Sequence, residues 1–120
     1  MSAHVEIVKK YIDGFREGNS QKTLSCLAED VTWNIYGHKS LSGIDQFAAE
    51  LKNDAFEGNP ELQILSVVEN ANTVAIQGSG RVKQRGGDWL PFVFSEFFAF
   101  TNGKVKTLDT YHIFLSTAAA

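Results

Sequence analysis

The stretch WLPFVFSEFFAFTNGKVKTLDTYHIFL, from Trp89 to Leu115, decides the fold. At its centre is Asn102-Gly103, a dipeptide that accepts the positive φ angles of a two-residue type I′ turn. The residues on both sides of this turn are mostly aromatic, β-branched or alternating in polarity, which is typical of strands. The pattern therefore predicts two long antiparallel strands folded about Asn102-Gly103.

The predicted hairpin brings two carboxylates together. With Thr101 and Lys104 closing the turn, Glu96 lies opposite Asp109 as a non-hydrogen-bonded pair, whose Cβ atoms are roughly 4.5–5.5 Å apart. Because side chains alternate along a strand, the neighbours of this pair on the same face are largely apolar. They are Phe92, Phe94, Phe98 and Phe100 from the first strand and Val105, Thr107, Tyr111 and Ile113 from the second. The acids form either a proton-transfer dyad or a structural polar cluster held by Gln77, Tyr111 or a cation.

The other face of the predicted hairpin is also apolar. Its members are Val93, Phe97, Ala99, Leu108, Thr110, His112 and Phe114. Helices on one side of a sheet cannot cover both faces, so we expect a homodimer through this second face. On this assignment His112 is an interface histidine rather than a catalyst.

Two further strands precede the hairpin. Leu62 to Val68 and Thr73 to Arg85 have strand-like patterns, with a turn between Glu69 and Asn72. Gly86-Gly87 predicts a second two-residue hairpin that places Gln77 beside Glu96. Gly78 and Gly80 predict a bulge or bend in a strongly curved sheet.

The first half of the chain has three helical patterns. The first begins after Ser2 as N-cap and ends at Gly18; the second begins at Asn19 or Ser20 and ends at Glu29-Asp30. One strand, 31–36, and a polar loop, 37–39, precede a third helix that begins at Ser42 and ends before Gly58. Helices followed by a meander of strands predict an α+β fold, with three N-terminal helices packed on a strongly curved antiparallel sheet.

Composition limits the classes of function. The chain has 120 residues, 43% of them hydrophobic and 21% charged, which predicts a single domain over residues 1–120. A net charge of -3 without any basic run argues against nucleic acid or an anionic membrane as partner. No apolar run approaches the roughly 18 residues of a membrane span. The single cysteine, Cys26, fits a core position in a reducing compartment, so we expect a cytoplasmic protein. Three histidines without ligand spacing predict no metal site, and we expect no cofactor.

Nearly the whole chain resembles the nuclear transport factor 2-like superfamily, which includes ketosteroid isomerases, limonene epoxide hydrolases and SnoaL-like polyketide cyclases. The resemblance rests on VKKYI at 8–12, LAEDVTW at 27–33, SGI at 42–44 and FAFTNGKV at 98–105. It implies a cone-shaped α+β barrel, a pocket between the helices and the concave sheet, and frequent homodimers. It does not imply one reaction, because functional sites vary on a shared fold.

The resemblance also implies roles for individual residues. Glu96 matches the position of the protonated aspartic acid in the oxyanion hole of ketosteroid isomerases, a case in which an apolar site keeps a carboxylic acid neutral. Tyr11 matches their hydrogen-bond-donating tyrosine; the alternative is an amphipathic core tyrosine. The general base of those enzymes falls near Asn34 or Ile35, neither of which accepts a proton from carbon. The aspartate common in the closing strand of SnoaL-like proteins falls on Ile113.

The sequence thus predicts a small cofactor-independent enzyme of isomerase, epoxide hydrolase or polyketide cyclase type that acts on a small apolar molecule. The catalytic candidates are Glu96, Asp109 and Tyr11. The substrate-binding candidates are Trp33, Asn34, Gln77, Phe92, Phe94, Phe98 and Tyr111. The alternative is a non-catalytic domain that binds a hydrophobic ligand or acts as a dimeric adaptor.

Overall fold

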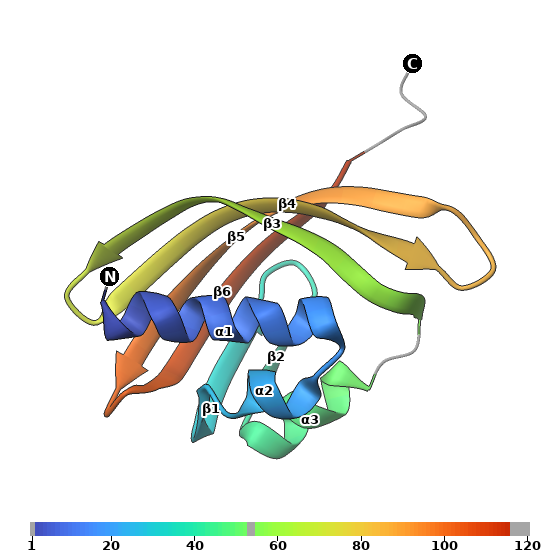
Figure 1. Ribbon diagram of the computed structural model, residues 1–120. Helices are drawn as coiled ribbons and strands as arrows, with labels where there is room; N and C mark the ends of the chain where they lie inside the picture. The colour runs from blue at the N-terminus through green and yellow to red at the C-terminus, as the bar shows by residue number, and fades with distance from the viewer. Residues whose placement is uncertain (1, 53–54, 116–120) are drawn as a thin grey trace.

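The computed structural model describes residues 2–52 and 55–115. It shows helices packed against the concave face of a curved sheet, as the sequence predicts (Figure 1), and the sheet has six strands where five were predicted. In chain order the elements are α1 (Ala3–Glu17), α2 (Ser20–Leu24), β1 (Leu27–Ile35), β2 (Lys39–Ser42), α3 (Ile44–Leu51), β3 (Phe56–Asn70), β4 (Thr73–Gln84), β5 (Trp89–Thr101) and β6 (Lys104–Phe114). The strand order is β2-β1-β6-β5-β4-β3. β1 and β6 are parallel, so the sheet is mixed rather than wholly antiparallel.

The first helix has the predicted ends. The Ser2 hydroxyl accepts a hydrogen bond from the N–H of Val5 at 3.0 Å, and Gly18 ends the helix at φ 66°. Val8 and Ile12 are buried, and α1 lies across the concave face of the sheet (Figure 1). This helix therefore forms one wall of whatever space remains beneath the sheet.

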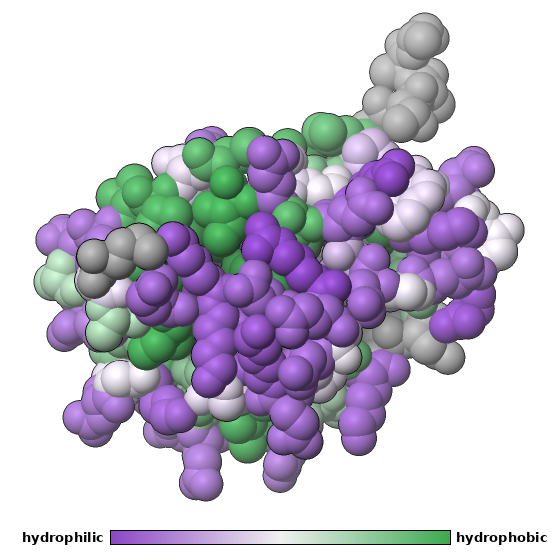
Figure 2. Space-filling view, viewed as in Figure 1, coloured by the Kyte–Doolittle hydropathy of each residue, from purple (hydrophilic) through white to green (hydrophobic). Residues whose placement is uncertain are grey.

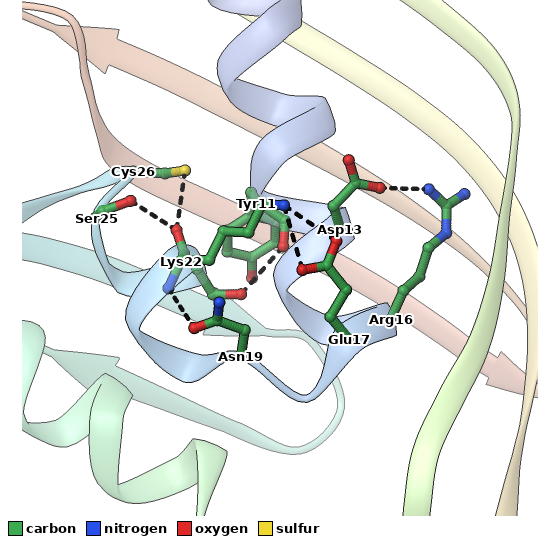
Figure 3. Close-up of polar contacts among 9 residues, drawn as sticks. Tyr11, Asp13, Arg16, Glu17, Asn19, Lys22, Ser25 and Cys26 are labelled. Carbon is green, nitrogen blue, oxygen red and sulfur yellow. Dashed lines mark hydrogen bonds and ion pairs between the residues drawn. The ribbon is translucent and has the colours of Figure 1, made fainter.

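The second helix is shorter than predicted. Asn19 caps it, and Figure 3 shows its contact with Lys22, whose N–H donates to Asn19 Oδ1 at 3.1 Å. The same view shows Lys22 Nζ paired with Glu17 at 3.0 Å, which links α2 to the end of α1. The helix ends at Leu24 because Leu27 pairs with Val105 in β6. Sheet pairing thus overrides the helical spacing of the residues after Leu24.

Three boundaries around α3 also differ from the prediction. Residues 39–42 form β2, paired with β1, although Lys39 was predicted to end a loop and Ser42 to begin a helix. Gly43, not Ser42, is the N-cap of α3, and the N–H of Ser42 instead donates to Gln46 Oε1 at 2.8 Å. β3 begins at Phe56 and runs through Pro60, which an edge strand tolerates. The segment 58–60 was predicted to be a break and is part of this strand.

The glycines of β4 make room for aromatic rings. Gly78 pairs with Phe94 and Gly80 pairs with Phe92. A Cβ atom at Gly78 would overlap the Phe94 ring, and one at Gly80 would lie 3.0 Å from the Phe92 ring. The bend that these glycines predict is accompanied by register shifts in β3, between Glu57 and Glu61 and between 64 and 66. The two glycines therefore leave room for the phenylalanine rings over β4.

The hairpin of β5 and β6 has the predicted turn and a different register. Thr101 pairs with Lys104, and the turn residues Asn102 and Gly103 have φ values of 52° and 75°. The ladder then shifts, because Phe100 pairs with Val105 whereas Ala99 pairs with Thr107. The extra residue, Lys106, is a β-bulge.

This bulge corrects the predicted pairing. Glu96 lies opposite Thr110, and Asp109 lies opposite Phe97. A one-residue slip moves every later side chain of β6 to the other face. Leu108, Thr110 and His112 are therefore on the concave side, and Thr107, Asp109, Tyr111 and Ile113 are on the outer side.

The preceding hairpin differs by one residue as well. Its loop has three residues, 85–87, because Gln84 and Asp88 form the hydrogen bond that closes it. Ile76 therefore pairs with Glu96, and Gln77 pairs with Ser95. Gln77 is exposed on the outer face, away from Glu96.

The core lies between the helices and the concave face. Its largest fully buried side chains include Tyr11, Phe47, Phe98, Ile76 and Leu108. Hydrophilic side chains dominate the helical layer in Figure 2, and hydrophobic ones gather above it over the strands. Cys26 is buried, as predicted. No helix within residues 2–52 and 55–115 is long and apolar enough to cross a membrane.

Candidate functional site

A cavity of about 180 Å³ lies between α1 and the concave face of the sheet. Its walls are almost entirely apolar and come from α1, β1, β3, β5 and β6. The lining residues are Tyr11, Ile12, Phe15, Trp33, Pro60, Leu62, Phe92, Phe94, Glu96, Thr110 and His112. Five side chains in this list carry hydrogen-bonding or proton-transfer groups, and they meet only because the sheet curves around α1.

Glu96 is a buried acid with one oxygen held and the other open. Its side chain comes from β5, and the residue is 6% exposed. The Thr110 hydroxyl donates to Glu96 Oε2 at 2.7 Å, and Trp33 Nε1–H donates to Thr110 Oγ1 at 2.9 Å. Within the described residues Glu96 Oε1 has no hydrogen-bond partner. The cavity therefore has a carboxyl oxygen that is available to a ligand.

The surroundings of Glu96 favour its neutral form. Burial among apolar side chains raises the pKa of Glu96 to about 7, because the carboxylate loses its hydration, and the bond from Thr110 opposes this rise. No cation pairs with Glu96 among the described ion pairs. Near neutral pH a large share of Glu96 is therefore a carboxylic acid that can donate a hydrogen bond.

Tyr11 supplies a second oxygen. Its ring packs edge-on against Phe98, with centroids 5.3 Å apart, and Thr23 Oγ1 donates to its backbone carbonyl at 3.1 Å. The Tyr11 hydroxyl is buried and has no hydrogen-bond partner among the described residues. Burial and the nearby Glu96 raise the pKa of Tyr11, so the phenol stays protonated. An unsatisfied buried donor costs about 1–3 kcal/mol, which a ligand oxygen would relieve.

His112 lies at the exposed end of the same cavity. Its ring stacks obliquely on Phe92, with centroids 4.2 Å apart, and also contacts Phe114. Loss of hydration beside these rings lowers the pKa of His112 below its usual 6.5. The imidazole is therefore mostly unprotonated near neutral pH. The position of His112 corrects the prediction, which placed it on the opposite face of the sheet.

Some of the predicted site residues do reach the cavity. Trp33, Phe92 and Phe94 line it together with Glu96 and Tyr11. Phe98 is fully buried behind the Tyr11 ring, so it supports the site without lining it.

Four other predicted site residues lie on the outer face: Asn34, Gln77, Asp109 and Tyr111. Asn34 Nδ2 donates to Asp109 Oδ1 at 2.8 Å, and the Tyr111 ring stacks on Tyr36 with centroids 4.8 Å apart. Asp109 also raises the pKa of the exposed Tyr36 phenol. The predicted dyad of Glu96 and Asp109 is wrong, because the bulge at Lys106 places the two acids on opposite faces.

Thr110 and His112 are the functional candidates that sequence reasoning missed. One signal for the bulge was present. Val105 and Leu108 are both strongly apolar yet three residues apart, and strict alternation cannot bury both. Placing one extra residue between them would have moved Thr110 and His112 to the concave face.

Across the described part of the chain there is no group of three or more His, Cys, Asp or Glu side chains that could hold a metal ion.

Helices packed on a curved mixed sheet, with an apolar cavity between them, define a small α+β pocket protein of the nuclear transport factor 2-like kind. The family model for the SnoaL-like domain matches residues 8–108, and the chain belongs to this family. No curated protein matches the chain by sequence.

Solved structures share the fold at low sequence identity. An NTF2-like protein of unknown function from Burkholderia pseudomallei K96243 is 20% identical with a TM-score of 0.84, over 92% of this chain and 90% of that one. An LEH-like epoxide hydrolase of M. tuberculosis is 13% identical with a TM-score of 0.81, over 92% and 83%. TerC, crystallised with polyporic acid, is 21% identical with a TM-score of 0.80, over 98% and 95%. Family and fold are therefore as the sequence predicts.

Proposed function

We propose that the protein is an enzyme that moves a proton on a small, mostly apolar carbonyl compound, in a reaction of isomerase or cyclase type. The observation that carries this proposal is a pair of oxygens on two residues that line one apolar cavity, Glu96 Oε1 and Tyr11 Oη, neither of which has a hydrogen-bond partner among the described residues. Both donate hydrogen bonds when protonated, and both pKa directions favour the protonated form. A carbonyl oxygen accepts two such bonds.

His112 completes the proposed chemistry. Its unprotonated ring nitrogen takes a proton from the carbon next to the carbonyl, the electron pair of that C–H bond forms a C=C bond, and the π pair of the C=O bond moves onto the oxygen. Glu96 and Tyr11 stabilise the resulting enolate by hydrogen bonding. The enolate then attacks an electrophile in the same molecule or takes the proton back at another carbon. The base that the sequence does not provide at Asn34 or Ile35 is thus supplied from β6.

The shape of the site favours an extended substrate. A second cavity, of about 260 Å³, shares Phe15, Trp33 and Pro60 with the first. Its two acids are already engaged: Glu50 pairs with Lys39, and Glu57 pairs with Lys83. The first cavity alone is below the roughly 300–1,000 Å³ of ordinary ligand pockets, whereas the two together reach that range. We infer that the reacting carbonyl lies at Glu96 and that apolar substituents extend past Trp33.

Deuterium exchange of an apolar ketone tests the proposal without knowledge of the natural substrate. The protein is incubated with 2-indanone in D₂O, and proton NMR follows the loss of the signal from the protons next to the carbonyl. The wild type should accelerate exchange, and Glu96→Gln and His112→Gln should each abolish most of the acceleration. Asp109→Asn and His38→Gln are matched controls at the outer face and in an exposed loop, and both should behave as wild type.

The same experiment separates the competing function. Suppose that 2-indanone and larger apolar ketones change the tryptophan fluorescence of the protein, but that none of them shows accelerated exchange. This result would overturn the enzyme proposal. It would favour a domain that binds a hydrophobic ligand without chemistry.

We also propose a homodimer through the outer face of the sheet. Phe97 and Tyr111 are each 44% exposed there, their rings contact one another, and Ile113 is 61% exposed. The corrected register removes Leu108, Thr110, His112 and Phe114 from the predicted contact surface. The proposed surface is therefore that of Phe97, Tyr111 and Ile113.

A further inference from the structure

We propose that Thr110 and Trp33 are positioning residues that determine which oxygen of Glu96 carries its proton. This inference deepens the proposed function, because it concerns the acid of the same cavity. Neither residue has to touch the reacting atoms for the mechanism to depend on it.

The direction of each hydrogen bond follows from what its partners can donate. The indole Nε1–H only donates, so Thr110 Oγ1 must accept from Trp33 at 2.9 Å. Thr110 has one hydroxyl proton, and the short 2.7 Å contact to Glu96 Oε2 is the buried side-chain contact that can take it. The Trp33 N–H occupies one acceptor site of Thr110 Oγ1, and the Thr110 proton is then donated to Glu96 Oε2, which is the acceptor of this bond.

This direction decides where the acidic proton is. The carbonyl oxygen of a neutral carboxyl group accepts hydrogen bonds better than its hydroxyl oxygen does, so the 2.7 Å bond from Thr110 favours Oε2 as the carbonyl oxygen. The proton is consequently placed on Oε1, the oxygen without a partner in the described chain. The acid thus presents its O–H, rather than its carbonyl, to the cavity that Tyr11 also faces.

The relay is held rigidly by its surroundings. Trp33 and Thr110 are 8% and 6% exposed, and the Trp33 ring stacks on Phe47 with centroids 4.1 Å apart and planes 19° apart. Trp33 belongs to β1, Thr110 to β6 and Glu96 to β5, three neighbouring strands of the sheet. Their order in the sheet fixes the order of the relay.

Removing the indole N–H should reverse the relay without removing the hydroxyl. In Trp33→Phe the Thr110 hydroxyl is free to rotate, so neutral Glu96 can place its proton on Oε2 and donate to Thr110 Oγ1. The cavity would then receive a bare carbonyl oxygen. A purely structural role for Trp33 predicts no such change in the acid itself.

Infrared difference spectroscopy between low and high pH reads this change directly. The carbonyl stretch of neutral Glu96, identified by its absence in Glu96→Gln, is measured in Thr110→Ser, Thr110→Val and Trp33→Phe. Thr110→Val and Trp33→Phe each remove the hydrogen bond accepted by the Glu96 carbonyl, so the band should move to higher frequency. Thr110→Ser keeps the hydroxyl and should keep the wild-type band.

Two matched controls and the contrary result complete the test. Thr107→Val, on the outer face of the same strand, and Trp89→Phe, whose ring lies under Arg81, should leave the band unchanged. A band that stays in place in either Thr110→Val or Trp33→Phe would overturn the proposal. The readout needs no substrate, so a failure of ketone exchange in the wild type would refute the proposed function and leave this assignment intact.

Discussion

Glu96 and Asp109 lie on opposite faces of the sheet, although the simplest register of their hairpin makes them neighbours. Asp109 pairs with Phe97 and accepts a hydrogen bond from Asn34 on the outer side, whereas Glu96 pairs with Thr110 over the cavity. The sheet itself lies between the two carboxylates. Each acid therefore has an environment of its own.

Asp109→Asn should leave the titration of Glu96 unchanged at about 7, because burial and not a second carboxylate raises that pKa. Carboxyl-carbon NMR of the wild type and the variant measures it. Thr110→Val is the contrasting variant: losing the bond to the carboxylate should raise the pKa of Glu96 further. A fall in the pKa of Glu96 in Asp109→Asn would restore the coupled dyad.

Glu96 should also make stability depend on pH. Its pKa rises from the usual 4.5 to about 7 on folding, so the folded state binds the proton more tightly. The associated stabilisation is fully present below pH 4.5 and is lost as pH rises to about 7, by about 3 kcal/mol in all. Urea unfolding at pH 4.5, 6 and 8 measures this loss.

The matched variant for this loss is Glu96→Gln, which keeps an oxygen for Thr110 and cannot ionise. The contribution of residue 96 to the unfolding free energy should then not change with pH. The stability of the variant relative to the wild type should therefore increase as pH rises. If the unfolding free energies of the wild type and of Glu96→Gln change in parallel with pH, the pKa of Glu96 is the same in the folded and unfolded states.

Tyr11→Phe should stabilise the protein while weakening its site. The substitution removes a buried hydroxyl without a partner and keeps the ring contacts to Phe98 and Phe15, so we expect a gain of about 1 kcal/mol in unfolding free energy. Denaturant unfolding measures the gain, and ketone exchange should fall in the same variant. Tyr36→Phe, on the outer face, is the control and should leave exchange unchanged. A loss of stability in Tyr11→Phe would mean that the hydroxyl has a partner in solution.

Local chemistry explains which parts of the fold could be predicted. The Ser2 and Gly18 caps, the Asn102-Gly103 turn and the alternation of phenylalanines in β5 act within a few residues, so the sequence pattern predicts them correctly. The family resemblance predicts the overall architecture. Glu96 and Tyr11 reach the cavity because they lie on these locally determined elements.

Pairing between strands explains most of the features that could not be predicted from the sequence. The first residues of β1 are a strand because β6, distant in the chain, pairs with them, and β2 is a strand because it pairs with β1. The bulge at Lys106 is stabilised in the same way, since its Nζ contacts Asp30 Oδ2 in β1 at 2.9 Å. Because of this one extra residue, Thr110 and His112 face the cavity in place of Asp109 and Tyr111. A site is therefore harder to predict than the fold that carries it.

Phe97→Asp should separate the proposed homodimer. A charge in the centre of the outer-face contact would be desolvated without a partner on association, which opposes dimer formation. Sedimentation at micromolar concentration should change from about twice 13.2 kDa to 13.2 kDa. Lys52→Asp, an exposed change at the end of α3, is the control. A wild type that sediments as a monomer would refute the dimer.

The pH dependence of ketone exchange should be bell-shaped, because the reaction needs neutral Glu96 and unprotonated His112 together. Exchange falls as pH rises through about 7, where Glu96 loses its proton, and falls on the acid side as His112 gains one. The lowered pKa of His112 places that acid limb below its usual 6.5, so the optimum lies between the two limbs. Tyr11 shares the cavity but stays protonated throughout.

The variant His112→Gln identifies the acid limb. Exchange should fall by about 100-fold or more, and the residual rate should keep only the limb near pH 7 that belongs to Glu96. His38→Gln, in the loop between β1 and β2, should retain the full bell. If His112→Gln keeps the acid limb, then another group is the base, and the proton leaves carbon by a route that does not involve His112.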